Sequence, residues 1–459
     1  MGGKRQKNQL VLAFMAEAKG EAGGYAEGGT EPLAAVNEHE SPARYEQLME
    51  EVCQPENLRQ AYRRVKANKG SAGVDGMTVH RLRGYLIRHW PAIREQLLSG
   101  TYEPKPVKRV EIPKPDRGVR KLGIPTVLDR FVQQAVLQVL QRQWDRTFSE
   151  HSYGFRPGRS ARQAVEAAQQ YQRDGYRWVV DIDLEKFFDR VNHDRLMGAV
   201  SLRVADKRVL KLIRAFLNAG VMENGLVSPS VEGTPQGGPL SPLLSNLVLD
   251  ELDGELKRRK LRFARYADDC NIYVGSERAG RRVMESITRF ITKRLKLKVN
   301  QAKSAVARPW ARKFLGFSFT SEKRPRRRIA AKAVDRFKER VRELTKRTRG
   351  VSLEQMVSKL GTYLRGWRSY FGFCETPSVL KSLEAWIRRR LRCVVWKQWR
   401  RGRRRAAELL RLGVPQDLAI CTAGSALGPW RLSNSKAMTA ALPPASFTSL
   451  GLPSLLPVS

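Results

Sequence analysis

The spacing of apolar residues separates irregular from helical regions in the first hundred residues. Residues 19–42 show no period and are rich in Gly, Glu and Ala, a composition that cannot repay the entropy cost of ordering. We therefore expect a disordered leader over residues 1–44. Beyond it, apolar residues recur at near-helical spacing as far as Gly100. This pattern predicts a helical N-terminal extension over residues 45–105.

A period of two appears in three stretches further along the chain. Residues 107–124 alternate apolar and charged side chains around an Asp-Arg-Gly turn, which predicts a basic β-hairpin. Residues 177–184 predict a strand with an acidic end. Residues 262–274 predict two short strands joined through the pair Asp268-Asp269. The sequence thus places carboxylates at the end of one strand and at the tip of one hairpin.

Two polar pairs predict where helices begin. Thr126 stands three residues before Asp129, and Ser160 stands three residues before Gln163. Pairs at this spacing satisfy free N–H groups at a helix start. We therefore expect one helix to begin just after Thr126 and another just after Ser160.

From residue 324 onward the pattern is helical and strongly basic. It predicts a helical domain over residues 324–400 that faces phosphate, with an aromatic stripe that forms its core rather than a base-stacking surface. The stripe consists of Leu360, Tyr363, Leu364, Trp367, Tyr370 and Phe371. The Pro/Ser/Leu-rich tail that follows has weak periodicity, so we expect a small basic C-terminal segment over residues 401–459.

The composition points to a polyanionic partner. The 459 residues carry 85 Lys and Arg against 45 Asp and Glu, a net charge of +40, while 41% of residues are hydrophobic. That apolar content argues against a disordered or collagen-like chain. Phosphate backbones are the common partners of such a basic surplus, so nucleic acid is expected. The five cysteines include no C-x-x-C pair, and no apolar run is long enough to span a membrane.

The predicted strand ends carry the chemistry. An acidic cluster that contains Asp181, Asp183 and Asp189 ends one strand, and Asp268 and Asp269 occupy the hairpin tip, so carboxylates of the two strand ends can converge. Carboxylates on adjoining strands suit two Mg²⁺ ions that clamp the attacking and leaving oxygens of a phosphoryl displacement. Taken singly, each Asp is more often a cap or a turn former. Asp181 lies on the same face of the strand as Asp183, because residues i and i+2 share a face, so it could be a fourth metal ligand.

Short motifs follow one another in a fixed order along the chain. They are Gly73-Val-Asp-Gly76, Ile112-Pro-Lys-Pro115, Leu122-Gly-Ile-Pro125, His151-Ser-Tyr-Gly-Phe-Arg-Pro157, Asp183 with Phe187-Phe188, Gly233-Thr-Pro-Gln-Gly-Gly-Pro239, Tyr266-Ala-Asp-Asp269, Asn300 with Lys303, and Leu315-Gly-Phe317. Over about residues 55–400 this order resembles the reverse transcriptases encoded by group II introns. The resemblance implies an α+β right-hand polymerase, with fingers and a split-βαβ palm over residues 106–323 and a helical thumb, or domain X, over residues 324–400.

The resemblance also implies roles for individual residues. Asp183, Asp268 and Asp269 would be the catalytic, metal-binding carboxylates, and Phe188 the aromatic gate that excludes a 2′-hydroxyl. Three basic fingers residues would bind the triphosphate: Lys108, Lys114 and Arg120. Gln236 would lie beside the base pair, and Lys303 would lie near the departing pyrophosphate. Alternative interpretations are a core aromatic for Phe188, a solvated basic hairpin for the fingers and an ordinary turn for the Gly-rich loop.

Basic residues of the thumb would contact nucleic acid phosphates. The residues expected to do so are Arg326, Arg327, Arg328, Lys332, Arg336 and Arg365. All five histidines precede residue 194 and no cysteine pair occurs late in the chain. The chain therefore resembles the short, endonuclease-lacking branch of the family, and cleavage of a target strand is not expected of it.

The resemblance implies an RNA-directed DNA polymerase that uses two Mg²⁺ ions and a maturase that assists splicing and mobility. Expected partners are group II intron RNA, an RNA template with a DNA primer, target DNA and deoxynucleoside triphosphates, with no membrane. The expected location is a nucleoid-associated ribonucleoprotein of the bacterial cytoplasm. Two alternatives remain: an RNA-binding splicing factor with an idle polymerase site, and a reverse transcriptase recruited to CRISPR spacer acquisition or phage defence.

Overall fold

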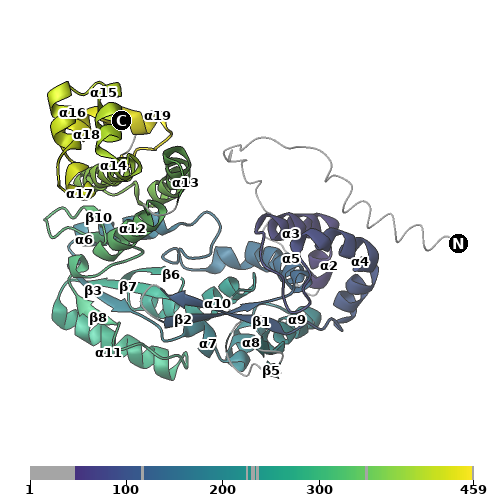
Figure 1. Cartoon of the computed structure of the whole chain (residues 1–459). Coiled ribbons are helices and arrows are strands. Elements are labelled where there is room, and N and C mark those ends of the chain that lie inside the picture. The colour runs from purple at the N-terminus through teal and green to yellow at the C-terminus, as the bar shows by residue number, and fades with distance from the viewer. Residues whose placement is uncertain are drawn as a thin grey trace. The chain divides into compact units, whose positions relative to one another are not determined.

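The computed structural model describes residues 47–114, 118–223, 226–228, 233, 237–346 and 350–456. The predicted leader over residues 1–44 and the predicted loop residue Gln236 lie outside these ranges. The chain divides into two compact units, whose elements are labelled in Figure 1. Unit 1 comprises Met1–Ala164 and Val180–Val306, and unit 2 comprises Val165–Val179 and Ala307–Ser459.

Unit 1 begins with helices that pack through the apolar stripes seen in the sequence. Helix α3 (Pro55–Ala67) lies along α5 (Val127–Trp144). A buried side chain locks the pair, because Asn57 donates from Nδ2 to the carbonyl of Ala135 at 3.0 Å. The other described helices of this unit are α2 (Leu48–Val52), α4 (Leu82–Ser99), α7 (Phe187–Arg190), α8 (His193–Ser201), α9 (Lys207–Asn218), α10 (Ser241–Arg258) and α11 (Glu277–Lys293).

Both predicted helix starts are present. Thr126 caps α5 by accepting a hydrogen bond from the backbone N–H of Asp129 at 3.0 Å. Helix α6 (Ala161–Arg173) follows Ser160, whose N–H donates to Gln163 Oε1 at 2.7 Å while its hydroxyl accepts from the Gln163 N–H at 3.3 Å. The reciprocal bonds of the second pair are those of a capping box.

The predicted basic hairpin forms one edge of a four-stranded sheet of order β2-β1-β4-β5. Strand β1 (Val107–Lys114) pairs antiparallel with β2 (Gly118–Ile124). Its other edge pairs in parallel with β4 (Val221–Glu223), which pairs with β5 (Leu226–Ser228). Two segments about a hundred residues apart therefore share one sheet.

The second four-stranded sheet carries the acidic strand ends. Its order is β6-β7-β3-β8, built from β6 (Arg262–Tyr266), β7 (Asp269–Val274), β3 (Trp178–Ile182) and β8 (Ala305–Ala307). Strands β6 and β7 form an antiparallel hairpin. Helices α10 and α11 contact β6 and β7 respectively. The central strands are buried, as expected for a sheet that supports a site on rigid elements.

Unit 2 has an apolar core shared by long helices. It includes Phe337 of α12 (Ala331–Leu344), Leu364 of α13 (Leu353–Phe371) and Leu383 of α14 (Pro377–Gln398). The predicted aromatic stripe is largely confirmed as core, since Leu360, Leu364 and Trp367 are buried, whereas Tyr370 is exposed.

One prediction for unit 2 is corrected, and one expectation is extended. The helical pattern expected from about residue 325 begins only at Ala331, because β10 (Arg327–Ile329) pairs with β9 (Phe317–Phe319). The tail, for which no elements were expected, forms helices whose apolar residues join the core of unit 2. Its helices are too short to show a clear period: α15 (Gly402–Arg411), α16 (Gln416–Ala423), α17 (Pro429–Leu432), α18 (Lys436–Ala441) and α19 (Pro444–Ser449). No described helix has the length and hydropathy to cross a bilayer.

Candidate active site

Neighbouring strands of the second sheet position the predicted carboxylates. Asp183 follows β3 directly, while Asp268 lies in the two-residue turn between Tyr266 and Asp269, which are partners in the β6–β7 register. Ala267 adopts a left-handed φ of 57°, which closes this tight turn. All three aspartates are partly exposed. The sequence therefore placed them correctly at a strand end and a hairpin tip on adjacent strands.

The thiol of Cys270, at the start of β7, reports on the charge around these strand ends. Burial raises the pKa of Cys270, and the negative charges of Asp253, Asp269 and Asp181 raise it further, while Arg265 opposes them. Asp181 from β3 and Asp269 from β7 thus act on the same buried sulfur. Strands β3 and β7 are neighbours in the sheet, so the acidic end of β3 lies beside the start of β7. The convergence of Asp183 with Asp268 and Asp269 on one metal site stays a prediction.

The carboxylates do not form a closed metal cage. Within the described ranges, no group of three or more His, Cys, Asp or Glu side chains is arranged so that it could hold a metal ion. Mg²⁺, however, is usually held by one or two carboxylates together with water and substrate phosphates. The donor set of Asp183, Asp268 and Asp269 consists of oxygen ligands only. It fits a magnesium site that substrate completes.

A loop after α11 holds the backbone of Asp183. Its N–H donates to Ser304 Oγ at 3.0 Å, and its carbonyl accepts from the Asn300 N–H at 2.8 Å. Lys303 lies in the same loop, with its backbone N–H bonded to the Asn300 carbonyl at 3.2 Å and its side chain exposed. Lys303 therefore lies in the loop whose residues Asn300 and Ser304 hydrogen-bond to the backbone of Asp183.

A buried arginine behind the hairpin tip was not singled out by sequence reasoning. Arg265 and Asp253 of α10 form an ion pair at 2.5 Å, and both side chains are 0% exposed. Arg265 also donates to the carbonyl of Ala267 at 2.9 Å, to Asn246 Oδ1 at 3.0 Å and to Ser152 Oγ at 2.7 Å. Burial opposes the charge of Arg265, but Asp253 outweighs it and raises the pKa of the guanidinium. Arg265 thus ties the turn to α10 and to the segment around Ser152.

The segment containing Ser152 runs along β6 and supports the same turn. The N–H of Arg265 donates to the His151 carbonyl, and the N–H of Tyr153 donates to the Arg265 carbonyl, both at 2.9 Å. A Cβ on Gly154 would lie 2.3 Å from the backbone nitrogen of Ala267. Only a glycine allows this approach, so the His-Ser-Tyr-Gly motif acts as the backing of the hairpin tip.

A cavity of about 490 Å³ opens beside Asp268. Its lining includes Phe188, Leu122 of β2 and the pair Gly237-Gly238. The volume is typical of a small-molecule site. The structure therefore brings the predicted gate, one predicted carboxylate and the Gly-rich motif around one space.

Gly233 packs closely against the backbone of the predicted gate. With a φ of 89°, Gly233 lies so close that a Cβ there would be 2.8 Å from the Phe188 carbonyl oxygen. Gly233 donates to the Val191 carbonyl at 2.9 Å, and its own carbonyl lies 2.6 Å from His193 Nε2. Phe188 itself is partly exposed, which suits a cavity wall better than a core position.

The three basic fingers residues lie on the β1–β2 hairpin. Lys108 is exposed and opposes Ile124, Lys114 opposes Gly118, and Arg120 opposes Ile112. The side chains of Lys114 and Arg120 lie outside the described part of the chain. Their role in binding the triphosphate stays a prediction, as does that of Gln236.

The basic residues predicted to bind nucleic acid differ in their surroundings. Lys332, Arg336 and Arg365 are exposed on α12 and α13. Arg326 is exposed but pairs with Glu322 at 2.7 Å. Arg328 donates to Ser318 Oγ at 3.0 Å.

Arg327 is the least accessible of the six predicted basic contacts. Its side chain is 16% exposed and faces Glu375 and Glu166 at 3.3 and 3.6 Å. These ion pairs fasten β10 within unit 2, so this arginine has a structural partner that sequence reasoning did not identify.

Comparisons with known families match two parts of the chain. Residues 112–319 match the family described as "Reverse transcriptase (RNA-dependent DNA polymerase)", and residues 334–413 match "Group II intron, maturase-specific domain". The first match contains all of the predicted carboxylates, and the second covers most of the predicted thumb. Neither match is to an endonuclease domain.

Two curated relatives match about half of the chain. Protein YkfC of Escherichia coli is 41% identical over 224 residues, covering 48% of this chain and 59% of the relative. The group II intron-encoded protein LtrA of Lactococcus lactis is 36% identical over 222 residues, covering 48% of this chain and 37% of the relative. The chain thus spans less than two thirds of either relative.

A chain of a solved partial Cas6-RT-Cas1–Cas2 complex is 25% identical to this chain. The match covers 54% of this chain and 42% of the other, with a TM-score of 0.35. A structural overlap this small supports no functional inference.

Proposed function

We propose that this chain, which has the reverse transcriptase domain and the maturase-specific domain of group II intron-encoded proteins, extends a DNA primer on an RNA template. The observation that supports this most is the cavity shared by Asp268, Phe188 and the Gly237-Gly238 pair. A nucleotide in that cavity lies beside the acidic strand ends, where a primer terminus attacks.

Each residue of the site has a defined task in this proposal. Asp183, Asp268 and Asp269 would hold two Mg²⁺ ions, whose chemistry would be to activate the primer hydroxyl and to offset the charge that develops on the phosphates. Lys108, Lys114 and Arg120 bind the triphosphate from the fingers hairpin. The Arg265 network and Gly154 keep the hairpin tip rigid, so that Asp268 is preorganised.

A primer extension assay tests the polymerase proposal. The purified full chain is given an RNA template, a DNA primer, deoxynucleoside triphosphates and MgCl₂, and is compared with an Asp268→Asn/Asp269→Asn variant. Loss of outer-shell groups commonly costs 10- to 100-fold, so removal of direct ligands should slow extension more than ~100-fold. Asp194→Asn is the matched control, because this aspartate is 83% exposed on α8 and pairs with Arg214.

The variant should still bind RNA, because the substitution leaves the basic surfaces unchanged. Equal extension by the parent and the variant would overturn the catalytic assignment. Binding of RNA by the parent without extension would instead favour the splicing factor with an idle polymerase site.

Phe188 is proposed to exclude ribonucleotides by occupying the space of a 2′-hydroxyl. Phe188→Ala should lower the preference for deoxynucleotides by ~10-fold or more, since single-group steric discrimination is of that order. The ratio of kcat/KM for dCTP and CTP measures this preference. Leu137→Ala is the control, because it removes apolar bulk from the same cavity and should leave the ratio unchanged. An unchanged ratio in the Phe188 variant would exclude the gate role.

We further propose that unit 2 binds the parent intron RNA and assists its splicing and mobility. The support is the match of residues 334–413 to the maturase-specific family together with the exposed Lys332, Arg336 and Arg365. Such contacts go to phosphates and give affinity without sequence reading.

A further inference from the structure

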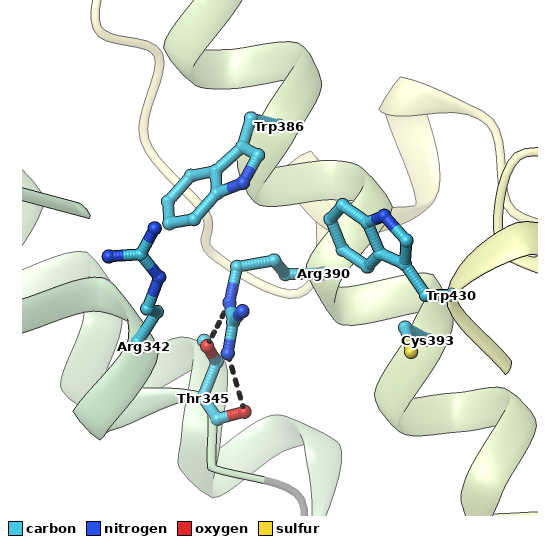
Figure 2. A pocket seen from close by; sticks show the side chains of 6 residues that line it. All are labelled: Arg342, Thr345, Trp386, Arg390, Cys393 and Trp430. Carbon is cyan, nitrogen blue, oxygen red and sulfur yellow. Dashed lines mark hydrogen bonds between the residues drawn. The ribbon is translucent and has the colours of Figure 1, made fainter. Parts of the chain in front are cut away.

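Unit 2 contains a cavity that the polymerase chemistry does not use. Its volume is about 270 Å³. Helix α12 with its C-terminal cap, helix α14 and helix α17 contribute its walls. The lining residues are Arg342, Thr345, Trp386, Arg390, Cys393 and Trp430 (Figure 2).

The cavity combines fixed positive charge with flat aromatic surface. The guanidinium carbons of Arg342 and Arg390 lie 5.7 and 5.3 Å from the ring centroid of Trp386. Arg390 is oriented by Thr345, to which it donates from Nε at 2.8 Å. Figure 2 shows the Arg390 guanidinium directed toward Thr345. None of the six lining residues is acidic, so the cavity is suited to an anion.

Trp430 is held in place without being buried. Its side chain remains 40% exposed. Arg389 of α14 stacks at 4.1 Å from the ring centroid and donates to the Trp430 carbonyl at 3.1 Å. A large indole that is kept rigid at the surface is a ready platform for stacking, because little entropy is lost when a flat ligand covers it.

We propose that this cavity binds one unstacked nucleotide of a single-stranded nucleic acid. Its base stacks on an indole and its phosphate faces Arg342 and Arg390, the combination of aromatic platform and basic groove by which single strands are held. The small volume favours one nucleotide over a duplex. The inference builds on the proposed nucleic-acid function of unit 2 and assigns it a defined site, completed by Trp430 from beyond the maturase match.

The site is tested with a 12-nucleotide RNA strand and the same strand with every base removed, so that only sugar and phosphate remain. Binding to the full chain is measured by fluorescence anisotropy. Trp430→Ala should weaken binding of the natural strand ~10-fold, the order expected for one lost stacking contact, and leave the abasic strand unaffected. Trp430→Phe keeps an aromatic face and should restore most of the affinity.

The phosphate contact has a separate signature. Arg342→Gln should weaken both strands and lower the slope of log K against log salt by about 0.7, the value for one phosphate contact on a single strand. Arg340→Gln is the matched control, because it removes the same charge from the same helix and its side chain instead pairs with Glu343. That variant should keep the parent slope.

Each outcome decides the proposal. Equal loss for natural and abasic strands in Trp430→Ala, or no loss for either, would overturn it, with melting temperatures confirming that the variants are folded. If Trp430→Ala also weakens binding of a DNA strand that carries bases, the site accepts both ribonucleotides and deoxynucleotides. If the base-dependent loss occurs with only one of the two nucleic acids, the site binds that nucleic acid. Failure of the polymerase proposal can be told apart from failure of this one. In the Asp268→Asn/Asp269→Asn background, Trp430→Ala should still weaken binding of the natural strand and leave binding of the abasic strand unaffected.

Discussion

Arg265 illustrates what one residue contributes to this site. Its charge is fully buried, which costs several kcal/mol unless a partner and further hydrogen bonds compensate for it. Asp253 supplies the opposite charge, and Asn246, Ser152 and the Ala267 carbonyl take the remaining donors. The compensation therefore fixes the backbone immediately before Asp268.

Breaking this pair should destabilise the protein strongly. Arg265→Met leaves Asp253 as an uncompensated buried charge, so we expect unfolding to become easier by ~3–5 kcal/mol in urea denaturation. Arg265→Met/Asp253→Leu removes both charges and should recover much of that stability. Primer extension should stay low in the double variant, because the Ala267 carbonyl has still lost its donor. Full recovery of extension would show that the pair serves stability alone.

At the scale of elements, the hairpin tip depends on a segment more than a hundred residues away in sequence. Residues 151–154 run along β6, and Gly154 contacts the turn at a distance that no other residue permits. The site is thus a composite of β3, the β6–β7 hairpin, α10 and this segment.

Gly154→Ala should displace the hairpin tip. The added methyl would lie 2.3 Å from a backbone nitrogen that cannot rotate away, and overpacking of this kind costs ~1–3 kcal/mol. We expect lower thermal stability and a loss of kcat in primer extension that exceeds any change in KM for the triphosphate. Gly198→Ala on α8 is the control, because nothing lies within 4 Å of the added atom. Parent-like extension by Gly154→Ala would contradict the positioning role.

The local elements that sequence reasoning recovered are those with a strong short-range signal. The hairpins at residues 107–124 and 262–274 have the period of two, and Thr126 and Ser160 have helix-start spacing. The strand β10 and the helices of the tail were missed. Strand β10 has only three residues in a basic run, and the tail helices are too short for a period to stand out.

At the scale of the whole molecule, the net charge of +40 should dominate nucleic-acid affinity. Under the proposed function, association with template and primer would release condensed counterions, so affinity should fall with salt. If the complex neutralises roughly 6–10 phosphates, affinity should drop by ~10³- to 10⁵-fold between 50 and 200 mM salt. Filter binding at fixed MgCl₂ measures the slope. An uncharged peptide nucleic acid strand is the control and should show almost none, while a flat slope for RNA would contradict a phosphate-dominated interface.

The order and type of residues along the chain are enough to predict the kind of chemistry and the class of partner. Carboxylates at predicted strand ends, the order of the motifs and the basic surplus are local or additive properties, so they can be read without coordinates. The tertiary structure decided what holds the chemistry in place. Arg265, Gly154 and Trp430 gain their importance from neighbours distant in sequence, because burial, close backbone approach and cavity walls exist only after the chain has folded.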